Sequence, residues 1–312
     1  GNYNVAVGDE AGTAITTGDN NVFIGYTAGD AVTAASDNIG IGYNALGGAN
    51  TGAENVAIGS NALDANTSGV SNTAMGYNAL GANTTGSYNI GIGQSAGGAI
   101  TTGEKNTLMG FAAGDALTVG VRNVALGYTA LGADTQGSKS VAIGPFALVN
   151  QNFTSATDVY NVAVGYDAGV SVTTGTRNTL TGALSGDAIT TGSQNSGFGM
   201  ASISSVTTGD NNTAVGHSSM QANTTADNNT AVGKSALTTN TTGASNVAVG
   251  VNALLSNTTA ANNTAVGQGA LEGNTTGASN VAIGTNSLDA NTTADNNTAV
   301  GFNSLGANTT GS

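Results

Sequence analysis

The stretch "NNTAVGKSALTTNTTGA" at residues 228–244 is followed at once by "SNVAVGVNALLSNTTAA" at residues 245–261, which repeats nearly the same phrase. Both contain an Asn, a short run of small and apolar residues, and a Gly, and this phrase begins at 18 places along the chain. Successive phrases start 17 residues apart, except for one step of 21 residues between Ser140 and Asn161. Such a short, constant period predicts a solenoid, in which each repeat is stable only when it stacks on its neighbours.

We number each repeat from the first residue of this phrase as position 1. The four extra residues of the long step fall within residues 149–160, which we expect to form an insertion loop in the repeat array. The repeats start at Asn4, Asn21, Asn38, Asn55, Asn72, Asn89, Asn106, Asn123, Ser140, Asn161, Asn178, Asn195, Asn212, Asn229, Asn246, Asn263, Asn280 and Asn297.

The composition favours an ordered, elongated protein. The 312 residues include 49 Gly and one Pro but no Cys or Trp, only 7% are charged, and the mean hydropathy is +0.01. Low charge and many Gly would also suit a disordered chain, but such chains lack the regularly placed apolar residues that every repeat has here. We expect one repeat domain, residues 1–312, and because the sequence begins and ends inside a repeat, we expect it to be part of a longer fibre.

The net charge of −13, from 18 acidic and five basic residues, argues against partners that carry many phosphates. Nucleic acids and anionic membrane surfaces attract clustered Lys and Arg, so we expect neither as a partner. The sequence has no apolar run of the about 18 residues that a membrane-spanning helix needs, and no recognisable signal peptide. Without Cys, neither disulfide bonds nor thiol chemistry is available.

Positions 1 to 5 of each repeat predict a short β-strand that ends at a corner. Position 2 is usually Val, Ile or Thr, position 4 is bulky and apolar in all repeats but one, and position 5 is Gly throughout. A Gly this regular indicates a backbone corner that needs a positive φ or has no room for a Cβ atom. The first eight of these structural corners are Gly8, Gly25, Gly42, Gly59, Gly76, Gly93, Gly110 and Gly127.

One large side chain occurs at either position 9 or position 12 of each repeat, and which of the two carries it varies along the chain. Where position 9 is Leu, as at Leu63, position 12 is small or polar; where position 9 is Gly, as at Gly114, position 12 becomes large, as at Leu117. An interior of fixed volume demands this compensation, because an empty or doubly filled site costs about 1–3 kcal/mol. We therefore expect positions 4, 9 and 12 to face a thin core, with the pair Ile203 and Val206 as an unexplained exception.

Position 3 is Ala, Gly, Phe or Leu in every repeat, as at Ala6, Phe23 and Leu108. In an extended strand it faces away from positions 2 and 4, so both sides of this strand are apolar. If position 4 faces the core, position 3 faces outward and needs a second packing partner. The natural partner is another copy of the chain, and closed cyclic symmetry would cover this seam along its whole length.

The repeats resemble those of a known family. The phrase "NVAIGSNALDANTSG" at 55–69 is similar to the head repeats of YadA-like trimeric autotransporter adhesins, whose "S-x-A-I-G-x-x-A" phrase matches "SVAIGPFA" at 140–147. Similar repeats occur in bacteriophage tail fibres. The resemblance implies an all-β fold, a left-handed parallel β-roll with three chains about one axis. It also implies an extracellular attachment role, on a bacterial cell surface or on a virion tail fibre, with a host surface, matrix or glycan as ligand.

Two groups of aromatic residues are candidates for ligand contact. Aromatic side chains recur at position 6, where neighbouring coils would hold them about 5 Å apart and could present their faces to a glycan, although such a column can also merely cover a turn. The insertion at 149–160 could project a recognition element, or could only relieve twist. The candidate contacts are Tyr26, Tyr43, Tyr128 and Tyr166 at position 6, and Phe153 and Tyr160 in the insertion.

The tract Asn-Thr-Thr recurs from position 12 and allows three interpretations. It matches the acceptor motif for N-linked glycans. It also suits turns in which stacked Asn and Thr side chains bond to the backbone and form ladders, which we favour. Thr columns are typical of ice-binding solenoids too, but adjacent Thr residues such as Thr16 and Thr17 would tend to face opposite ways.

The sequence offers no catalytic, cofactor or metal site. The sole histidine, His217, has no acidic residue near it within its repeat, and a nucleophile needs a positioned base. The Gly-Gly-x-Gly-x-Asp phrase of calcium-binding β-rolls is missing. We therefore expect a parallel β-solenoid of about 18 coils that serves as a structural or adhesive fibre and not as an enzyme, with an ice-binding or glycan-binding solenoid as the alternative.

Overall fold

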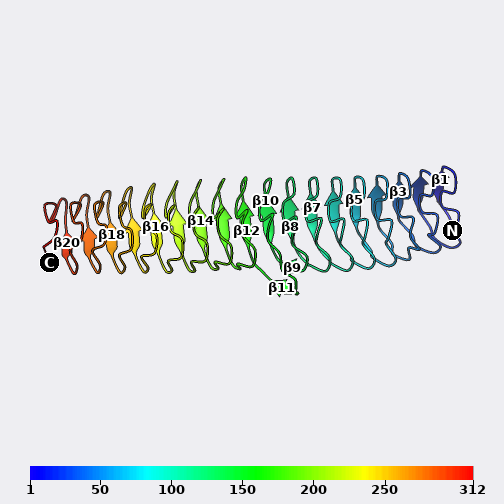
Figure 1. Cartoon of the computed structure of the whole chain (residues 1–312). Coiled ribbons are helices and arrows are strands. Elements are labelled where there is room, and N and C mark those ends of the chain that lie inside the picture. Colours follow the sequence, from blue (N-terminus) through cyan, green and yellow to red (C-terminus); the bar gives the residue numbers. More distant parts are fainter. Residues whose placement is uncertain (312) are drawn as a thin grey trace. The chain divides into compact units, whose positions relative to one another are not determined.

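The computed structural model describes residues 1–311, which contain β-strands, turns and irregular segments but no helix. The chain divides into two compact units, unit 1 covering Gly1–Tyr160 and unit 2 beginning at Asn161. Within each unit the chain winds into stacked coils, and each coil contributes one short strand to a parallel sheet (Figure 1). The fold is thus an all-β parallel β-solenoid, as the repeat period predicts.

The strands of the sheets are three residues long and occupy positions 2 to 4 of each repeat. In unit 1 they are β1 (Val5–Val7), β2 (Val22–Ile24), β3 (Ile39–Ile41), β4 (Val56–Ile58), β5 (Thr73–Met75), β6 (Ile90–Ile92), β7 (Thr107–Met109), β8 (Val124–Leu126) and β10 (Val141–Ile143). In unit 2 they are β12 (Val162–Val164), β13 (Thr179–Thr181), β14 (Ser196–Phe198), β15 (Thr213–Val215), β16 (Thr230–Val232), β17 (Val247–Val249), β18 (Thr264–Val266), β19 (Val281–Ile283) and β20 (Thr298–Val300).

Equivalent residues of successive coils stack in register. In unit 1, Ala57 of β4 pairs with Ala74 of β5, and in unit 2 Ala231 pairs with Ala248. The same offset of one repeat holds across the step from β8 to β10, where Val124 pairs with Val141. Each side chain therefore lies about 4.8 Å from its equivalent in the next coil, and every repeat position becomes a column of side chains.

The sequence-based assignment of strand faces is wrong. Position 3 points into the coil, where Phe23 and Leu108 are fully buried, whereas position 4 points outward, where Met109 is 41% and Ile283 is 42% exposed. Strand alternation relates the two faces but does not say which is inside. The decisive feature is the small Ala or Ser at position 8, which is also buried and packs in the same narrow interior. A thin interior accepts the smaller side chains of position 3.

The predicted compensation between positions 9 and 12 is confirmed. Leu63 at position 9 and Leu117 at position 12 are both fully buried. Position 3 takes part in the same compensation, because a Cβ added to Gly197 would lie 2.9 Å from Ile203 Cγ1. The coil that contains Gly197 therefore has room for both Ile203 and Val206, which are fully buried together.

Compensation also acts between neighbouring coils. A Cβ added to Gly40 would lie 2.9 Å from Cδ1 of Phe23 in the preceding coil, and one added to Gly29 would lie 2.5 Å from the same ring. The Phe23 ring thus fills space that its own coil and the next both leave empty. Interiors pack to a nearly constant density, so a large residue in one coil requires a small one beside it.

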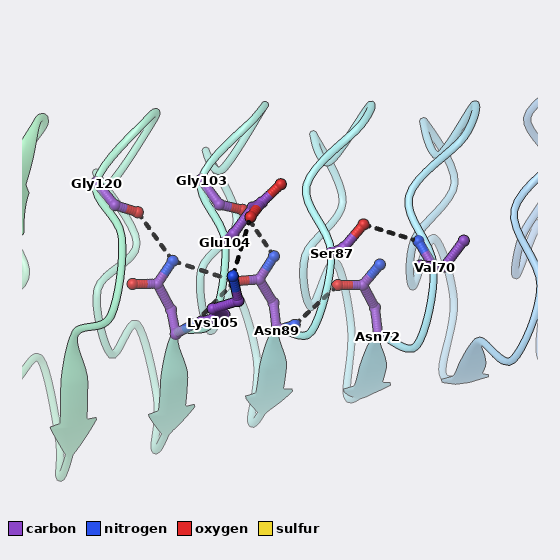
Figure 2. Close-up of polar contacts among 9 residues, drawn as sticks. Val70, Asn72, Ser87, Asn89, Gly103, Glu104, Lys105 and Gly120 are labelled. Carbon is purple, nitrogen blue, oxygen red and sulfur yellow. Dashed lines mark hydrogen bonds and ion pairs between the residues drawn. The ribbon is translucent and has the colours of Figure 1, made fainter.

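Position 1 forms a buried column of Asn side chains that ties the coils together (Figure 2). The backbone N–H of Asn89 donates to Oδ1 of Asn72 at 2.9 Å, and the Asn89 side-chain N–H donates to the carbonyl of Gly103 at 2.8 Å. The same two bonds recur at Asn106, which donates to Asn89 and to Gly120. One amide therefore supplies both an acceptor and a donor, which buried polar groups require.

The Gly at position 5 meets both conditions that the sequence analysis considered. Gly59 has a φ of +136°, and a Cβ added there would lie 2.4 Å from the carbonyl oxygen of Gly76 in the next coil. Gly76 and Gly93 have φ values of +134° and +129° and the same close approach to the following Gly. A side chain at this corner would clash with the neighbouring coil, so the stack itself excludes every residue but Gly.

Candidate functional site

The outer face of the sheet in unit 1 is a continuous apolar surface, which we call the sheet face and define by positions 2 and 4 of the strands. No charged residue occurs in any of these strands. Exposed fractions along position 4 include 38% for Ile24, 39% for Met75 and 41% for Met109. Position 4 of unit 1 consists of Val7, Ile24, Ile41, Ile58, Met75, Ile92, Met109, Leu126 and Ile143.

The sheet face of unit 2 has the same organisation with smaller side chains. Its strands also lack charged residues, and position 2 alternates between Val and Thr over much of its length. At position 4, Phe198 is 42%, Val215 37% and Ile283 42% exposed. Contiguous apolar patches of this kind are uncommon on isolated proteins and mark interaction sites.

Aromatic side chains at position 6 line one edge of the sheet face. The rings of Tyr26 and Tyr43 are stacked with centroids 5.8 Å apart and an interplanar angle of 18°. Tyr128 stacks on Phe111 at 5.2 Å and meets the edge of Phe146 at 5.3 Å. The structure therefore brings Tyr26 and Tyr43 together as one exposed pair and Tyr128 into a second group.

Tyr166 occupies position 6 in unit 2 and is 53% exposed. It belongs to the other compact unit.

The insertion at 149–160 contains β11 (Thr157–Asp158), which pairs in parallel with β9 (Gly137–Ser138) of the preceding coil, and this pair lies to one side of the coils in Figure 1. Phe153 is only 8% exposed, and its backbone N–H donates to Oδ1 of Asp134 at 3.1 Å. Phe153, expected as a ligand contact, is thus mostly buried, and its backbone N–H helps to hold the insertion.

Asp134 explains how the insertion is held. It stands at position 12, is fully buried, and accepts hydrogen bonds from the N–H of Gly137 at 2.9 Å and from Nε2 of Gln151 at 2.6 Å. Including the bond from Phe153, three N–H donors surround this carboxylate. Buried charged groups persist where donors satisfy them, so Asp134 fixes the start of the insertion.

Tyr160, the other candidate contact in the insertion, is exposed and lies beside a cation. Lys139 Nζ is 3.1 Å from the Tyr160 hydroxyl and 5.1 Å from the ring centroid, and it also pairs with Asp158 Oδ2 at 2.6 Å. The hydrogen bond from Lys139 lowers the pKa of Asp158, and the bond to Asp158, followed by that to Tyr160, raises the pKa of Lys139. The pair is therefore fully ionised at neutral pH.

Sequence reasoning missed a second group of residues at position 17. Lys105, Arg122 and Lys139 stand on three successive coils of unit 1, with Tyr88 on the coil before them and Tyr160 beyond. We call these five residues the basic column. The signal was present, because the three cations are each 17 residues apart, and three of the chain's five basic residues belong to it.

The Asn and Thr ladders that we favoured in the Asn-Thr-Thr tracts are present. The hydroxyl of Thr84 donates to the carbonyl of Thr101 in the next coil at 3.0 Å, and Asn83 Nδ2 donates to Asn66 Oδ1 at 3.1 Å. Six of the Asn residues in the glycan-acceptor motif are fully buried, so their amides are out of reach of a modifying enzyme in the folded coils. They are Asn83, Asn223, Asn240, Asn257, Asn274 and Asn291.

Residues 1–311 contain no group of three or more His, Cys, Asp or Glu side chains that could hold a metal ion. The same residues form no helix long and apolar enough to span a membrane. Comparison of the chain with models of known protein families gives no match, and comparison with curated protein sequences gives no significant match.

Proposed function

We propose that this chain is a structural and adhesive element of an extracellular fibre, in which three copies pack their sheet faces against one another. The observation that supports this proposal is the uncharged sheet face, which runs along every coil of both units. The resemblance of residues 55–69 to the heads of trimeric adhesins favours three copies and a left-handed winding of the coils.

The chemistry of the sheet face favours another copy of the same chain as its partner. A surface of Val, Ile, Met and Thr without charge is complementary to an identical surface, because neither partner leaves an ionised group out of water. The repeat makes this contact periodic, so a partner aligned with one coil is aligned with all coils of that unit. Burial of an Ile or Met side chain contributes about 1.5–3 kcal/mol, and the contribution recurs at every coil.

A stiff fibre suits attachment because each coil is held to the next by several independent interactions. These are the strand hydrogen bonds, the Asn column and the buried side chains. Repeated presentation of a weak binding group along such a fibre raises the overall affinity through avidity. We assign the fibre to a bacterial cell surface or a virion tail, where attachment to a host surface needs this property.

The assembly is tested with a charge placed on the sheet face. Ile58→Lys and Ile92→Lys together introduce two cations at outward positions, so the coils should remain folded while three-chain particles dissociate. The matched control is Ser68→Lys together with Thr102→Lys, since these two residues are exposed at position 14 of the coils that contain Ile58 and Ile92. Sedimentation should give three chains per particle for the unmodified protein and for the control.

The proposal is contradicted if the unmodified chain is a well-folded monomer at every concentration. Sedimentation would show the monomer, and the circular dichroism spectrum of a β-protein would show that it is folded. Because Ala231 lies at position 3 and is fully buried, a bulky substitution there would unfold a coil and would not test the assembly.

A further inference from the structure

The basic column is an unusual concentration of positive charge. The chain has five basic residues and 18 acidic ones, yet Lys105, Arg122 and Lys139 occupy the same position on three successive coils of unit 1. The backbone N–H of Arg122 donates to the carbonyl of Glu104 at 3.0 Å, and that of Lys105 to Ser87 at 3.0 Å. These bonds fix the rungs, so the three side chains emerge about 4.8 Å apart from a rigid support.

The two outer cations are held in place by neighbouring groups. Lys105 Nζ lies 5.9 Å from the Tyr88 ring centroid and 3.6 Å from Glu104 Oε2, and Figure 2 shows Lys105 beside Glu104. At the other end, Lys139 contacts Asp158 and Tyr160 as described above. Each end of the column is therefore a cation paired with one carboxylate and one aromatic ring.

Arg122, in the middle, is exposed and takes part in neither of the two ion pairs found among residues 1–311. Its guanidinium is a planar fork that binds a carboxylate or a sulfate through two parallel hydrogen bonds. Lys105 and Lys139 stand on either side, and because each is paired with one carboxylate, Arg122 carries the unbalanced positive charge of the column. The column can thus hold one anionic group at its centre.

The aromatic ends limit the kind of molecule that carries this anion. Tyr88 is 55% and Tyr160 46% exposed, and each offers a ring face at about two rungs from Arg122. Such rings pack against the apolar faces of sugar rings. An extended polysaccharide with acidic groups matches the order of ring, cation and ring.

A nucleic acid fits this surface less well. Its binding depends on neutralising many phosphates, and here two of the three cations already face carboxylates. Beyond the column the acidic residues of a chain with a net charge of −13 would repel the remaining phosphates.

We propose that the basic column, Tyr88, Lys105, Arg122, Lys139 and Tyr160, is a binding site for an acidic polysaccharide, with Arg122 holding its anionic group and the two tyrosines packing on flanking sugar rings. This inference rests on the attachment role proposed above and names its ligand class. It does not depend on the number of chains in the fibre.

The test measures binding of four probes to the assembled protein by isothermal titration calorimetry. The probes are oligogalacturonate, which carries carboxylates, a heparin oligosaccharide, which also carries sulfates, fully methyl-esterified oligogalacturonate, and a single-stranded oligonucleotide. We expect the protein to bind one or both acidic saccharides and not to bind the esterified oligogalacturonate. Which of the two binds identifies the anionic group.

The variant Arg122→Glu should weaken this binding about tenfold, as expected when an attraction is replaced by a repulsion of similar size. The variant Lys234→Glu changes the net charge by the same amount at position 6, outside the column position. It should bind as the unmodified protein does. Tyr88→Ala should also weaken binding, whereas Tyr43→Ala at position 6 should not.

Equal losses for Arg122→Glu and Lys234→Glu would overturn the proposal, because the effect would then follow net charge and not the column. Binding of the oligonucleotide with the same dependence on Arg122 would overturn it in favour of a nucleic-acid site. Sedimentation of the same samples separates the two proposals. Trimers that bind no acidic saccharide contradict only this inference, and monomers that bind it through Arg122 contradict only the assembly.

Discussion

At the scale of the residue, the coil is shaped by left-handed backbone conformations that are not confined to Gly. Positions 7, 9 and 17 adopt a positive φ in residues of many kinds, including 57° at Asn61, 50° at Leu63 and 61° at Gln194. For an L-residue other than Gly this conformation costs about 1–2 kcal/mol. The coils tolerate this cost because side chains at these positions have other roles, such as filling the core at Leu63 or meeting solvent at Gln194.

Gln194 and Gln268 allow this cost to be measured. Both are exposed in unit 2, but only Gln194 has a positive φ. Replacing either with Gly adds the same conformational freedom to the unfolded chain, while only Gln194→Gly relieves backbone strain. We expect Gln194→Gly to be more stable than Gln268→Gly by about 1–2 kcal/mol in urea unfolding. Equal stabilities would show that the side chain at position 17 compensates the strain.

At the scale of the element, the coil is a container of constant volume filled from positions 3, 8, 9 and 12. The Phe23 coil shows the limit of this rule, since its large ring is accommodated only because Gly29 and Gly40 lie beside it. Stability at this scale therefore depends on combinations of residues, and single substitutions should be strongly coupled to their neighbours.

Gly40→Ala tests this coupling. The added methyl group would lie 2.9 Å from the Phe23 ring, and overpacking of this kind costs about 1–3 kcal/mol. Phe23→Leu in the same chain removes the edge of the ring and should recover much of that loss, which a double-mutant cycle of unfolding free energies would show. Ala57 provides the comparison, because it occupies the same repeat position in the next coil and is fully buried there. Ala is therefore accepted at position 3 where no Phe precedes it. Additive effects would contradict shared filling of the two coils.

Much of this element could be predicted from the sequence. The spacing of Gly59 and Gly76 predicts the corner, and the exchange between Gly114 and Leu117 predicts the core at positions 9 and 12. The sequence could not predict whether the side chain at position 3 points into or out of the coil. Strand alternation places positions 3 and 4 on opposite faces without saying which face is inside, and the bulkier side chains at position 4 suggested the wrong one. The buried Ala at position 8 settles the matter, but a small residue gives little sequence signal of burial.

At the scale of the whole molecule, charge and apolar surface are kept apart. The strands that form the sheet face carry no charge, while the 18 acidic residues occupy turns and loops, except for Asp158 in β11. The basic column was overlooked in the sequence because the net charge of −13 suggested that cations have no role. Net charge describes the average field of a protein, whereas binding depends on the local arrangement that Lys105, Arg122 and Lys139 show.

The separation of charge from apolar surface predicts opposite effects of salt on the two proposed interactions. Raising the ionic strength from about 10 mM to about 0.15 M shortens the screening length from about 30 Å to about 8 Å. Repulsion between acidic copies should fall, so three-chain particles should persist at lower protein concentration in sedimentation. Binding of oligogalacturonate should weaken over the same range in calorimetry. Assembly that weakens with salt would show that ion pairs, and not the sheet face, hold the copies together.

The way the coils are filled has a consequence for how such a chain can change length over generations. From Asn229 to the coil that begins at Asn280, each interior holds the same set of residue types, with Ala or Ser at position 8 and Leu at position 9. Unequal recombination could add or remove any of these units without altering how the interiors of neighbouring coils are filled. The coils of Phe23 and Gly40 must instead be inherited as a pair, so heritable variation in length should accumulate in the uniform segment.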